Sequence, residues 1–300
     1  MSCGLVRRSA HGVIGLLLAL ALGCACAPAR ADWEITTEAG GQYDDNLTRA
    51  QDAVDKRAAG AAIIGVSGLS VTPWTGSDAI ILALYGRAEI YDRYSGLSNV
   101  ALGGNVAYRH KFGVGYAAPW VSVAVDGSYD NYRDNLRTGT RLDVRAETGR
   151  RLDQQADVAA GVYFERRYDN HGESIVPGIP GDVFALAGVG AYARGGYAFT
   201  NGLYVGVAAS VRRGDVESTA QQSLQIFLAS DAIAEDPVWG DPELYAYRLR
   251  GTTLGGALTA SYALSDNSSL NASYRYDVTH AAQDLHYMSN AVRLTFAYRF

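Results

Sequence analysis

Charged side chains occupy alternate positions in several segments of this 300-residue chain, and that spacing suits a polar wall. In residues 141–147, small or apolar residues separate Arg141, Asp143, Arg145 and Glu147. Alternate side chains of an extended strand point to the same face, so these four charges share one face. Charges of opposite sign at this spacing attract each other and present a dense, nearly neutral field to water or polar solutes.

The same alternation elsewhere predicts a larger set of charged residues, ten arginines and nine acids, that would line the lumen of a closed sheet. The set consists of Glu34, Glu38, Arg87, Glu89, Arg93, Arg109, Asp126, Arg141, Asp143, Arg145, Glu147, Asp157, Glu165, Arg167, Arg212, Arg275, Asp277, Arg293 and Arg299. Two interpretations stay open, because the two signs nearly balance. The charges either form a transverse field through which small hydrophilic solutes pass, or their ion pairs cross-link and fill the space that they face.

A candidate nucleophile and base lie close together in the loop 170–181. His171 and Ser174 are similar to the His and Ser pair of outer-membrane esterases, which use H-x-S spacing on a strand. Here the spacing is H-x-x-S, in a loop that contains Pro and Gly. Because a nucleophile and its base must lie within hydrogen-bond reach, we predict no catalytic residues and no enzyme activity. An outer-membrane hydrolase remains as a hypothesis beside the two functions considered at the end of this section.

Metal-binding chemistry has little support in the sequence. Asp44 and Asp45 supply two adjacent carboxylates, whereas calcium takes six or more oxygen ligands. We therefore predict a solvated loop at this position. His110, His280 and His286 are isolated along the chain, so we expect neither a metal nor a cofactor.

The elements that position the inward charges are predicted to be strands. In the last nine residues, Val292, Leu294, Phe296, Tyr298 and Phe300 alternate with polar or small residues. This period of two indicates a strand with one apolar and one polar face. The same pattern recurs along most of the chain.

The pattern favours a transmembrane β-barrel over a water-soluble sandwich. Opposite charges lie two residues apart on one face, and aromatic residues end the apolar face, as in barrels with a polar interior and aromatic girdles. Strands in lipid must also pair every backbone group, which only closure achieves. We thus predict an all-β, closed antiparallel barrel, with twelve strands and with ten or fourteen as alternatives. The predicted strands are 33–43, 58–71, 79–94, 98–110, 120–132, 138–152, 156–168, 182–199, 202–216, 245–264, 269–280 and 286–300.

The connectors predict how the barrel is oriented. All the long ones (44–57, 170–181 and 217–244) fall on one rim, which puts both termini on the periplasmic side. Trp33, Trp74 and Trp120 then lie near the periplasmic rim, as an aromatic girdle. In the longest connector, Leu224–Ile233 is apolar enough to form a short helix that constricts the lumen or covers the mouth.

Residues 1–31 are predicted to be a signal peptide, followed by a barrel domain at 32–300. Arg7 and Arg8 precede an apolar run, and Ala29-Arg30-Ala31 offers a cleavage site. An acylated Cys24 is the alternative. All three cysteines lie in this leader, and its removal leaves 23 basic against 31 acidic residues. A net negative chain argues against a nucleic-acid partner.

The closing strand 291–300 resembles the last strand of Gram-negative outer-membrane β-barrel proteins, which ends in Phe after alternating apolar residues. The resemblance implies a location in the outer membrane, contact with outer-membrane lipid, and recognition by the barrel-assembly machinery. Phe296, Tyr298 and Phe300 would carry that assembly signal.

A narrower resemblance concerns Trp33–Asn46 and the following Leu47, which look like the start of the barrel portion of surface-lipoprotein assembly modifiers. Members of that family carry a helical repeat domain before the barrel, which we do not expect here because the first strand follows the cleavage site directly. We predict a passive, porin-like channel for small hydrophilic solutes. The alternative is a non-conducting barrel for assembly, secretion or surface interaction, whose partner would be an exported protein.

Overall fold

The computed structural model describes residues 33–169 and 173–300, so the predicted signal peptide lies outside the described residues. The described residues form thirteen strands that belong to one antiparallel sheet. The strands are β1 Trp33–Asp44, β2 Ala59–Pro73, β3 Asp78–Tyr91, β4 Asn99–Lys111, β5 Trp120–Tyr132, β6 Gly139–Arg151, β7 Ala156–Asp169, β8 Ala187–Ala198, β9 Leu203–Gln221, β10 Ser230–Glu235, β11 Leu244–Ser265, β12 Ser268–Ala281 and β13 His286–Arg299.

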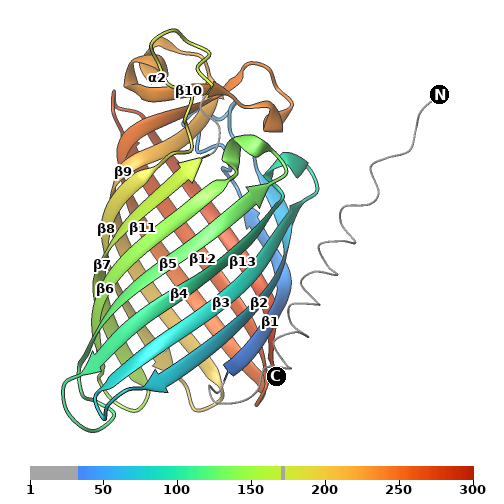
Figure 1. The fold of residues 1–300 in the computed structure, drawn as a ribbon. Helices are drawn as coiled ribbons and strands as arrows, with labels where there is room; N and C mark the ends of the chain where they lie inside the picture. The colour runs from blue at the N-terminus through green and yellow to red at the C-terminus, as the bar shows by residue number, and fades with distance from the viewer. Residues whose placement is uncertain (1–32, 170–172) are drawn as a thin grey trace.

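Twelve of these strands close into a barrel (Figure 1). Each pairs with its neighbours in the sequence, β1 pairs with β13, and β9 pairs with β11. The short β10 pairs with β11 but stands outside the ring. Closure leaves no sheet edge in the ring, as strands in lipid require. The predicted closed antiparallel barrel of about twelve strands is confirmed.

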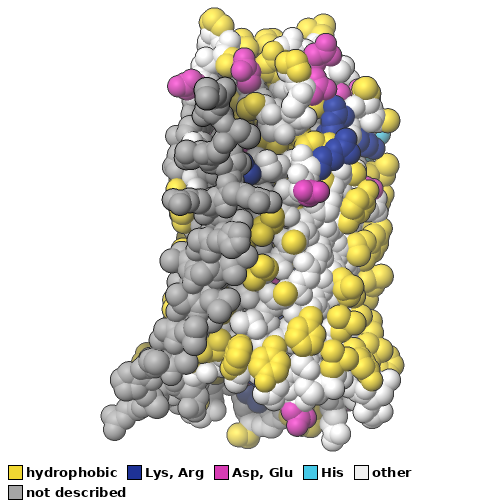
Figure 2. All heavy atoms as spheres, turned by 90° about the vertical axis from the view of Figure 1, so that its right-hand side faces the viewer, with side chains coloured by type: hydrophobic (Ala, Val, Ile, Leu, Met, Phe, Trp, Pro, Cys, Tyr) yellow, Lys and Arg dark blue, Asp and Glu magenta, His cyan; other side chains and the backbone are white. Residues whose placement is uncertain are grey.

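The outer wall of the barrel is apolar. On β5, Val121, Val123 and Val125 are exposed and alternate with Ser122, Ala124 and Asp126. Figure 2 shows hydrophobic side chains over much of one outer face. No helix among the described residues is long and apolar enough to span a membrane.

The two ends of the barrel differ. The end that carries the start of β1 and the end of β13, here named the terminal end, has short connectors (Figure 1). The opposite end carries the long connectors, which fold into a cap that covers the mouth. The cap contains α2 Leu224–Ala229, β10, and the 3-10 helices η1 Ser95–Leu97, η2 Asn135–Arg137 and η3 Pro237–Trp239. The predicted helix in the longest connector therefore forms, but it ends at Ala229 and β10 follows it.

One strand prediction needs correction. The predicted strand 182–199 begins only at Ala187, because Val183 and Phe184 are buried against Ala232, Ala234 and Ala246 in the cap. The predicted strand 245–264 forms as β11, and its pairing with β9 continues without a shift from Leu244 to Tyr262. The first residues of β11 extend beyond the barrel, where the cap buries both faces.

The buried hydrophobic clusters of the described residues all lie at the capped end. One joins the ends of β2 and β3 to η3 and β11 through Tyr91, Tyr94, Trp239 and Leu244. A second packs α2 and β10 onto β9 and β11 through Ile226, Ile233, Tyr247 and Leu249 among others. The cap thus contains a small packed core, whereas the rest of the interior is lined by polar side chains.

Candidate functional site

A cavity of about 590 Å³, here named the chamber, lies inside the barrel beneath the cap. Side chains from seven strands line the chamber. They include Gln42 on β1 and Thr253 on β11, which are far apart in the sequence. Four arginines and five acids are among them. They are Arg49, Arg212, Arg275, Arg293, Asp44, Glu165, Asp215, Glu217 and Asp277. Five of the residues that sequence analysis predicted to line the lumen meet there: Glu165, Arg212, Arg275, Asp277 and Arg293.

Several predicted lumen residues form ion pairs along one strand. Arg275 Nε lies 2.7 Å from Asp277 Oδ2 on β12. On β3, Arg87 Nε lies 3.3 Å from Glu89 Oε1, and on β6 Arg145 pairs with Asp143 at 3.2 Å. Such pairs follow directly from the two-residue spacing of the charges.

Other ion pairs join strands that lie one or two places apart. Arg293 on β13 donates to Glu38 on β1 at 2.5 Å, and Arg299 lies 3.5 Å from Glu34 in the same pair of strands. Three pairs cross one intervening strand: Arg212 with Glu165, Arg194 with Glu147 at 2.9 Å, and Arg167 with Glu217 at 3.9 Å. Between the adjacent strands β5 and β6, Asp130 pairs with Arg141.

These pairs share one geometric property. Among the described residues, no ion pair between barrel strands joins partners more than two strands apart, so none crosses the lumen. The charges therefore lie along the wall. Of the two arrangements left open by the sequence, this geometry favours a space that stays free over one that ion pairs fill.

Glycines allow long side chains to lie flat on this wall. A Cβ placed on Gly103 would lie 2.5 Å from the Tyr85 ring, which shows that the ring occupies the space above this glycine. From there the Tyr85 hydroxyl donates to Asp126 at 2.8 Å, two strands away. Tyr192 likewise lies over Gly161 and donates to Glu147 at 2.6 Å. The chain contains 34 Gly and 20 Tyr, and this arrangement gives some residues of both types a structural role.

The remaining predicted lumen residues make other contacts. The Arg93 guanidinium lies over the Tyr94 ring at 5.2 Å, and that of Arg109 lies over the Trp120 ring at 4.6 Å. Asp157 has no ion pair with any described residue. Sequence analysis missed Arg194 and Asp130. Both follow the period of two, since Arg194 lies two residues after Tyr192 and Asp130 four residues after Asp126.

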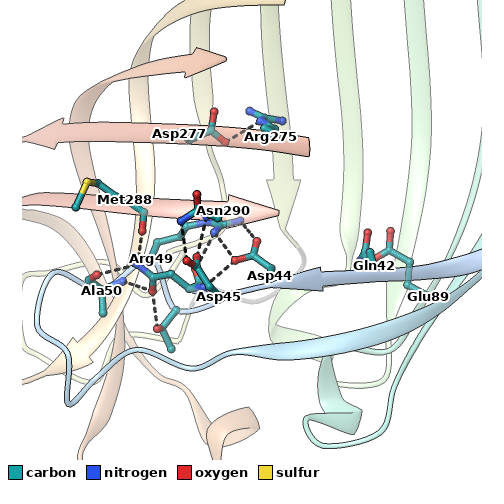
Figure 3. A network of polar contacts seen from close by, with 12 residues as sticks. Gln42, Asp44, Asp45, Arg49, Ala50, Glu89, Arg275, Asp277, Met288 and Asn290 are labelled. Carbon is teal, nitrogen blue, oxygen red and sulfur yellow. Dashed lines mark hydrogen bonds and ion pairs between the residues drawn. The ribbon is translucent and has the colours of Figure 1, made fainter. Parts of the chain in front are cut away.

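The roof of the chamber contains a polar network at the end of β1, shown in Figure 3. Arg49 pairs with Asp44 at 2.7 Å. Asp45 accepts hydrogen bonds from both the backbone N–H and the side chain of Asn290 at 2.7 Å. Asn46 donates to the carbonyl oxygens of Ala50 and Met288.

The prediction of a solvated loop at Asp44 and Asp45 is wrong. Asp44 and Asn46 are 9% and 1% exposed, and the hydrogen bonds of Asp45 and Asn46 fasten the first connector to β13. The connector then crosses the mouth, where the Thr219 N–H on β9 donates to the Thr48 carbonyl at 2.7 Å. Sequence alone could not reveal this, because the partners lie about 170 to 240 residues away.

A buried ion pair, here named the latch, holds the cap together. The Arg137 guanidinium donates two hydrogen bonds to the Asp236 carboxylate, at 2.9 and 2.6 Å. Asp236 is 2% exposed and also accepts from the Thr219 hydroxyl and the Trp239 indole N–H. Burial opposes ionisation of Asp236, but the charge of Arg137 and these hydrogen bonds outweigh it and lower the pKa of the carboxyl.

The other candidate chemistry is only partly covered by the described residues. His171 lies outside the described residues. The Ser174 hydroxyl donates to the backbone carbonyl oxygens of Val176 and Ile179, at 2.7 and 2.5 Å. No group of three or more His, Cys, Asp or Glu side chains in the described part of the chain could hold a metal ion.

The assembly-signal residues predicted on the last strand lie at the terminal end. Phe296, Tyr298 and Phe300 are all exposed, and the Tyr298 and Phe300 rings meet edge to face at 5.0 Å. Trp33 and Trp74 are exposed at the same end. These side chains form part of an aromatic girdle of the kind that borders membrane-embedded barrels.

The sequence matches no protein-family model and no curated protein. Solved structures with a similar fold are known. An outer-membrane channel from Pseudomonas putida F1 is 12% identical, with a TM-score of 0.56 over 92% of this chain and 97% of that one. The NanC porin is 7% identical, with a TM-score of 0.48 over 88% and 100% of the two chains.

The translocator domain of the autotransporter NalP from Neisseria meningitidis is 14% identical, with a TM-score of 0.42 over 97% and 96% of the two chains. The likeness to the Pseudomonas channel concerns the fold alone. It confirms the predicted resemblance to outer-membrane β-barrels, and the apolar outer wall agrees with the predicted location in the outer membrane.

Proposed function

We propose that the protein is a passive outer-membrane channel for small hydrophilic solutes, with the cap at its mouth limiting passage. The observation that carries this proposal is the course of the ion pairs, which follow the wall and leave the chamber free. Fixed charges of both signs replace part of the hydration shell of a polar solute. An apolar solute gains nothing from such a wall.

The size of the barrel supports small solutes. Barrels of about eight strands are filled by side chains, whereas barrels of sixteen or more leave an aqueous channel. A twelve-stranded ring lies between these limits, and its flat side chains widen the usable space. The chamber of about 590 Å³ has the volume of an ordinary small-molecule site.

The orientation of the barrel is part of the proposal. Outer-membrane barrels have short periplasmic turns and longer extracellular loops. The terminal end would therefore face the periplasm, and the cap would face outward. The exposed aromatic residues at the end of β13 would serve as the signal for the barrel-assembly machinery.

Planar-bilayer recording tests the channel and the role of the cap. Gln221 and Leu244 are directly paired, so an Asn-Gly turn can replace residues 222–243 and close the β9–β11 hairpin. We expect small or intermittent currents from the intact protein and steady currents that are at least several-fold larger from this uncapped variant. A folded, uncapped barrel that stays silent would refute the channel.

A second function, a non-conducting barrel that binds an exported protein, is favoured by one observation. The mouth is closed by packed hydrophobic clusters, which a freely open pore does not need. In this case the intact protein would retain a specific exported protein in a pull-down. The uncapped variant would lose that protein and would still carry no current.

A further inference from the structure

A row of polar and basic side chains crosses four adjacent strands on the outer wall. Thr252 on β11 is paired with Arg213 on β9 and with His280 on β12, and His280 is paired with His286 on β13. Paired residues point to the same side of a sheet, so these four side chains lie side by side at one height. We name them the outer row.

The outer row faces away from the lumen. Arg213, His280 and His286 are exposed. Two residues nearer the terminal end, the side chains on the same faces are apolar and exposed, as Val211 and Leu254 illustrate. One such step is about 7 Å along a strand, so the row lies just beyond the apolar wall, towards the cap.

A shallow cavity of about 380 Å³ opens beside the row. Arg213, Arg250, Thr252 and His280 line it, and Arg250 lies one step closer to the cap than Thr252. In Figure 2, basic side chains and a histidine gather near the upper rim of the outer face, above the hydrophobic area. The row is therefore part of a basic region at the edge of the apolar wall.

Two acidic groups that lie beside this region have partners. Asp231 pairs with Arg250 at 2.9 Å, and both side chains are largely exposed. Asp215 also lines the cavity, but its carboxylate accepts the Ala187 N–H at 2.9 Å. Arg213 forms no ion pair with any described residue. Its five N–H donors point to a ligand that lies outside the protein.

We propose that the outer row and Arg250 bind the phosphate monoesters of an anionic glycolipid in the membrane leaflet at the capped end. Guanidinium groups bind phosphate through paired, charge-assisted hydrogen bonds, and a hydroxyl and two imidazoles beside them supply further donors. The height of the row matches such a ligand, because lipid phosphates lie at the boundary between the apolar core and water. The proposal rests on the orientation given with the proposed function, not on conduction.

Native mass spectrometry of the purified barrel with an equimolar pair of glycolipids tests this site. One glycolipid carries two phosphate monoesters, and the other is the same molecule without phosphate. The variant R213Q/H280Q replaces the guanidinium group and one imidazole of the row with neutral amides. The control R133Q removes an exposed arginine that follows β5, on a different part of the capped rim.

We expect the intact barrel and R133Q to prefer the phosphorylated glycolipid, and R213Q/H280Q to lose about tenfold of that preference. Equal preference in all three proteins would overturn the proposal, as would an equal loss in R133Q. Phosphatidylglycerol offers a phosphodiester, and inorganic phosphate offers the group without the lipid. Binding of either as tightly as the phosphorylated glycolipid would overturn the assignment to a lipid monoester.

Two measurements distinguish a loss of lipid preference from misfolding of the variant and from failure of the proposed channel function. The shift in electrophoretic mobility on heating reports whether each variant is a folded barrel. Bilayer recording of R213Q/H280Q reports the lumen, which the outer row does not face. Unchanged currents with lost lipid preference would place the effect on the outer wall, and a silent barrel that keeps the preference would refute the channel alone.

Discussion

The capped end and the wall of the barrel hold their charges in different ways. In the cap, Arg137 and Asp236 form a bidentate ion pair that is almost fully buried and has further hydrogen bonds. On the wall, Arg293 and Glu38 form a pair whose side chains are each 31% exposed. Removal of one partner from a buried pair typically costs about 3–5 kcal/mol, whereas an exposed pair contributes about 0–1 kcal/mol. The cap is therefore a fixed structure, and the wall is a polar surface that can exchange its contacts with solutes.

Among the substitutions considered, Asp236→Asn should have the largest effect on stability, and it should act on the cap and not on the wall. It removes the charge of Asp236, so that Arg137 keeps only its ion pair with Asp134 at 2.9 Å, which should destabilise the cap by about 3 kcal/mol. Faster hydrogen exchange of the backbone amides in residues 217–244, with unchanged exchange in β3 to β6, would show that only the cap loosens.

The matched control replaces both partners of the latch, as Arg137→Met with Asp236→Leu. A buried pair exchanged for packed apolar side chains is often neutral or stabilising. Because the exchange also removes the acceptor of Thr219 and Trp239, this double variant should loosen the cap slightly, and less than Asp236→Asn does. If Asp236→Asn exchanged like the unaltered protein, the latch would not be what holds the cap.

Gly103→Val tests the wall itself. The new side chain would collide with the Tyr85 ring and with the Gly127 carbonyl oxygen, which lies 2.8 Å from the added Cβ. The ring must therefore turn into the lumen, and the backbone of β5 must shift slightly. Overpacking of this kind costs about 1–3 kcal/mol. In the uncapped variant we expect a smaller single-channel current. Gly256→Ala serves as the control, because no heavy atom lies within 4 Å of its added Cβ; an equal fall in current there would contradict this account of the wall.

The pH dependence of the cap should follow two carboxyl groups. The lowered pKa of Asp236 means that its contribution is present above its ordinary value of 3.8 and is lost as the pH falls through its folded-state pKa. Burial raises the pKa of Asp55, so protonation of that group stabilises the cap as the pH falls through its raised value. Mild acidification should therefore leave the cap closed.

Below the ordinary pKa, the contribution of Asp236 should fall by up to about 1.4 kcal/mol per pH unit. Bilayer currents recorded across the acid range would show this as opening at strongly acidic pH. The Asp236→Asn variant should lack the step. Opening of the intact channel near neutral pH would mean that another group controls the cap.

Arg293→Gln should have the smallest effect on stability, about 0–1 kcal/mol, because both side chains of its ion pair are about a third exposed. It removes one positive charge from the chamber and leaves Glu38 unpaired. The reversal potential in a salt gradient should shift towards cation selectivity. The control is Thr37→Val, in the same strand as Glu38, which leaves the net charge unchanged. A similar shift of the reversal potential in this control would show that the charge in the chamber is not the cause.

The periodic strands could be predicted from the sequence because the membrane and the lumen impose a period of two. The segment 139–151 shows why this works, since successive side chains of β6 face the outer surface and the lumen in turn. The ion pairs within one strand, such as Arg275 with Asp277, followed from the same spacing.

The cap could not be predicted in the same way. Phe184 follows a strand-like pattern, yet it is buried against β10 and the extension of β11, which contact it only after folding. The role of Gly103 depends on its position beside Tyr85, which requires the register between β3 and β4. Single-strand patterns do not contain this information.

The flat tyrosines have a consequence for how such tubes diversify. Where a glycine sits beside an aromatic ring, the ring rests against the sheet, and the calibre of the tube is set by side-chain posture as well as by circumference. Exchange of single glycines in evolution could therefore widen or narrow the lumen without changing the number of strands or the surrounding lipid contacts.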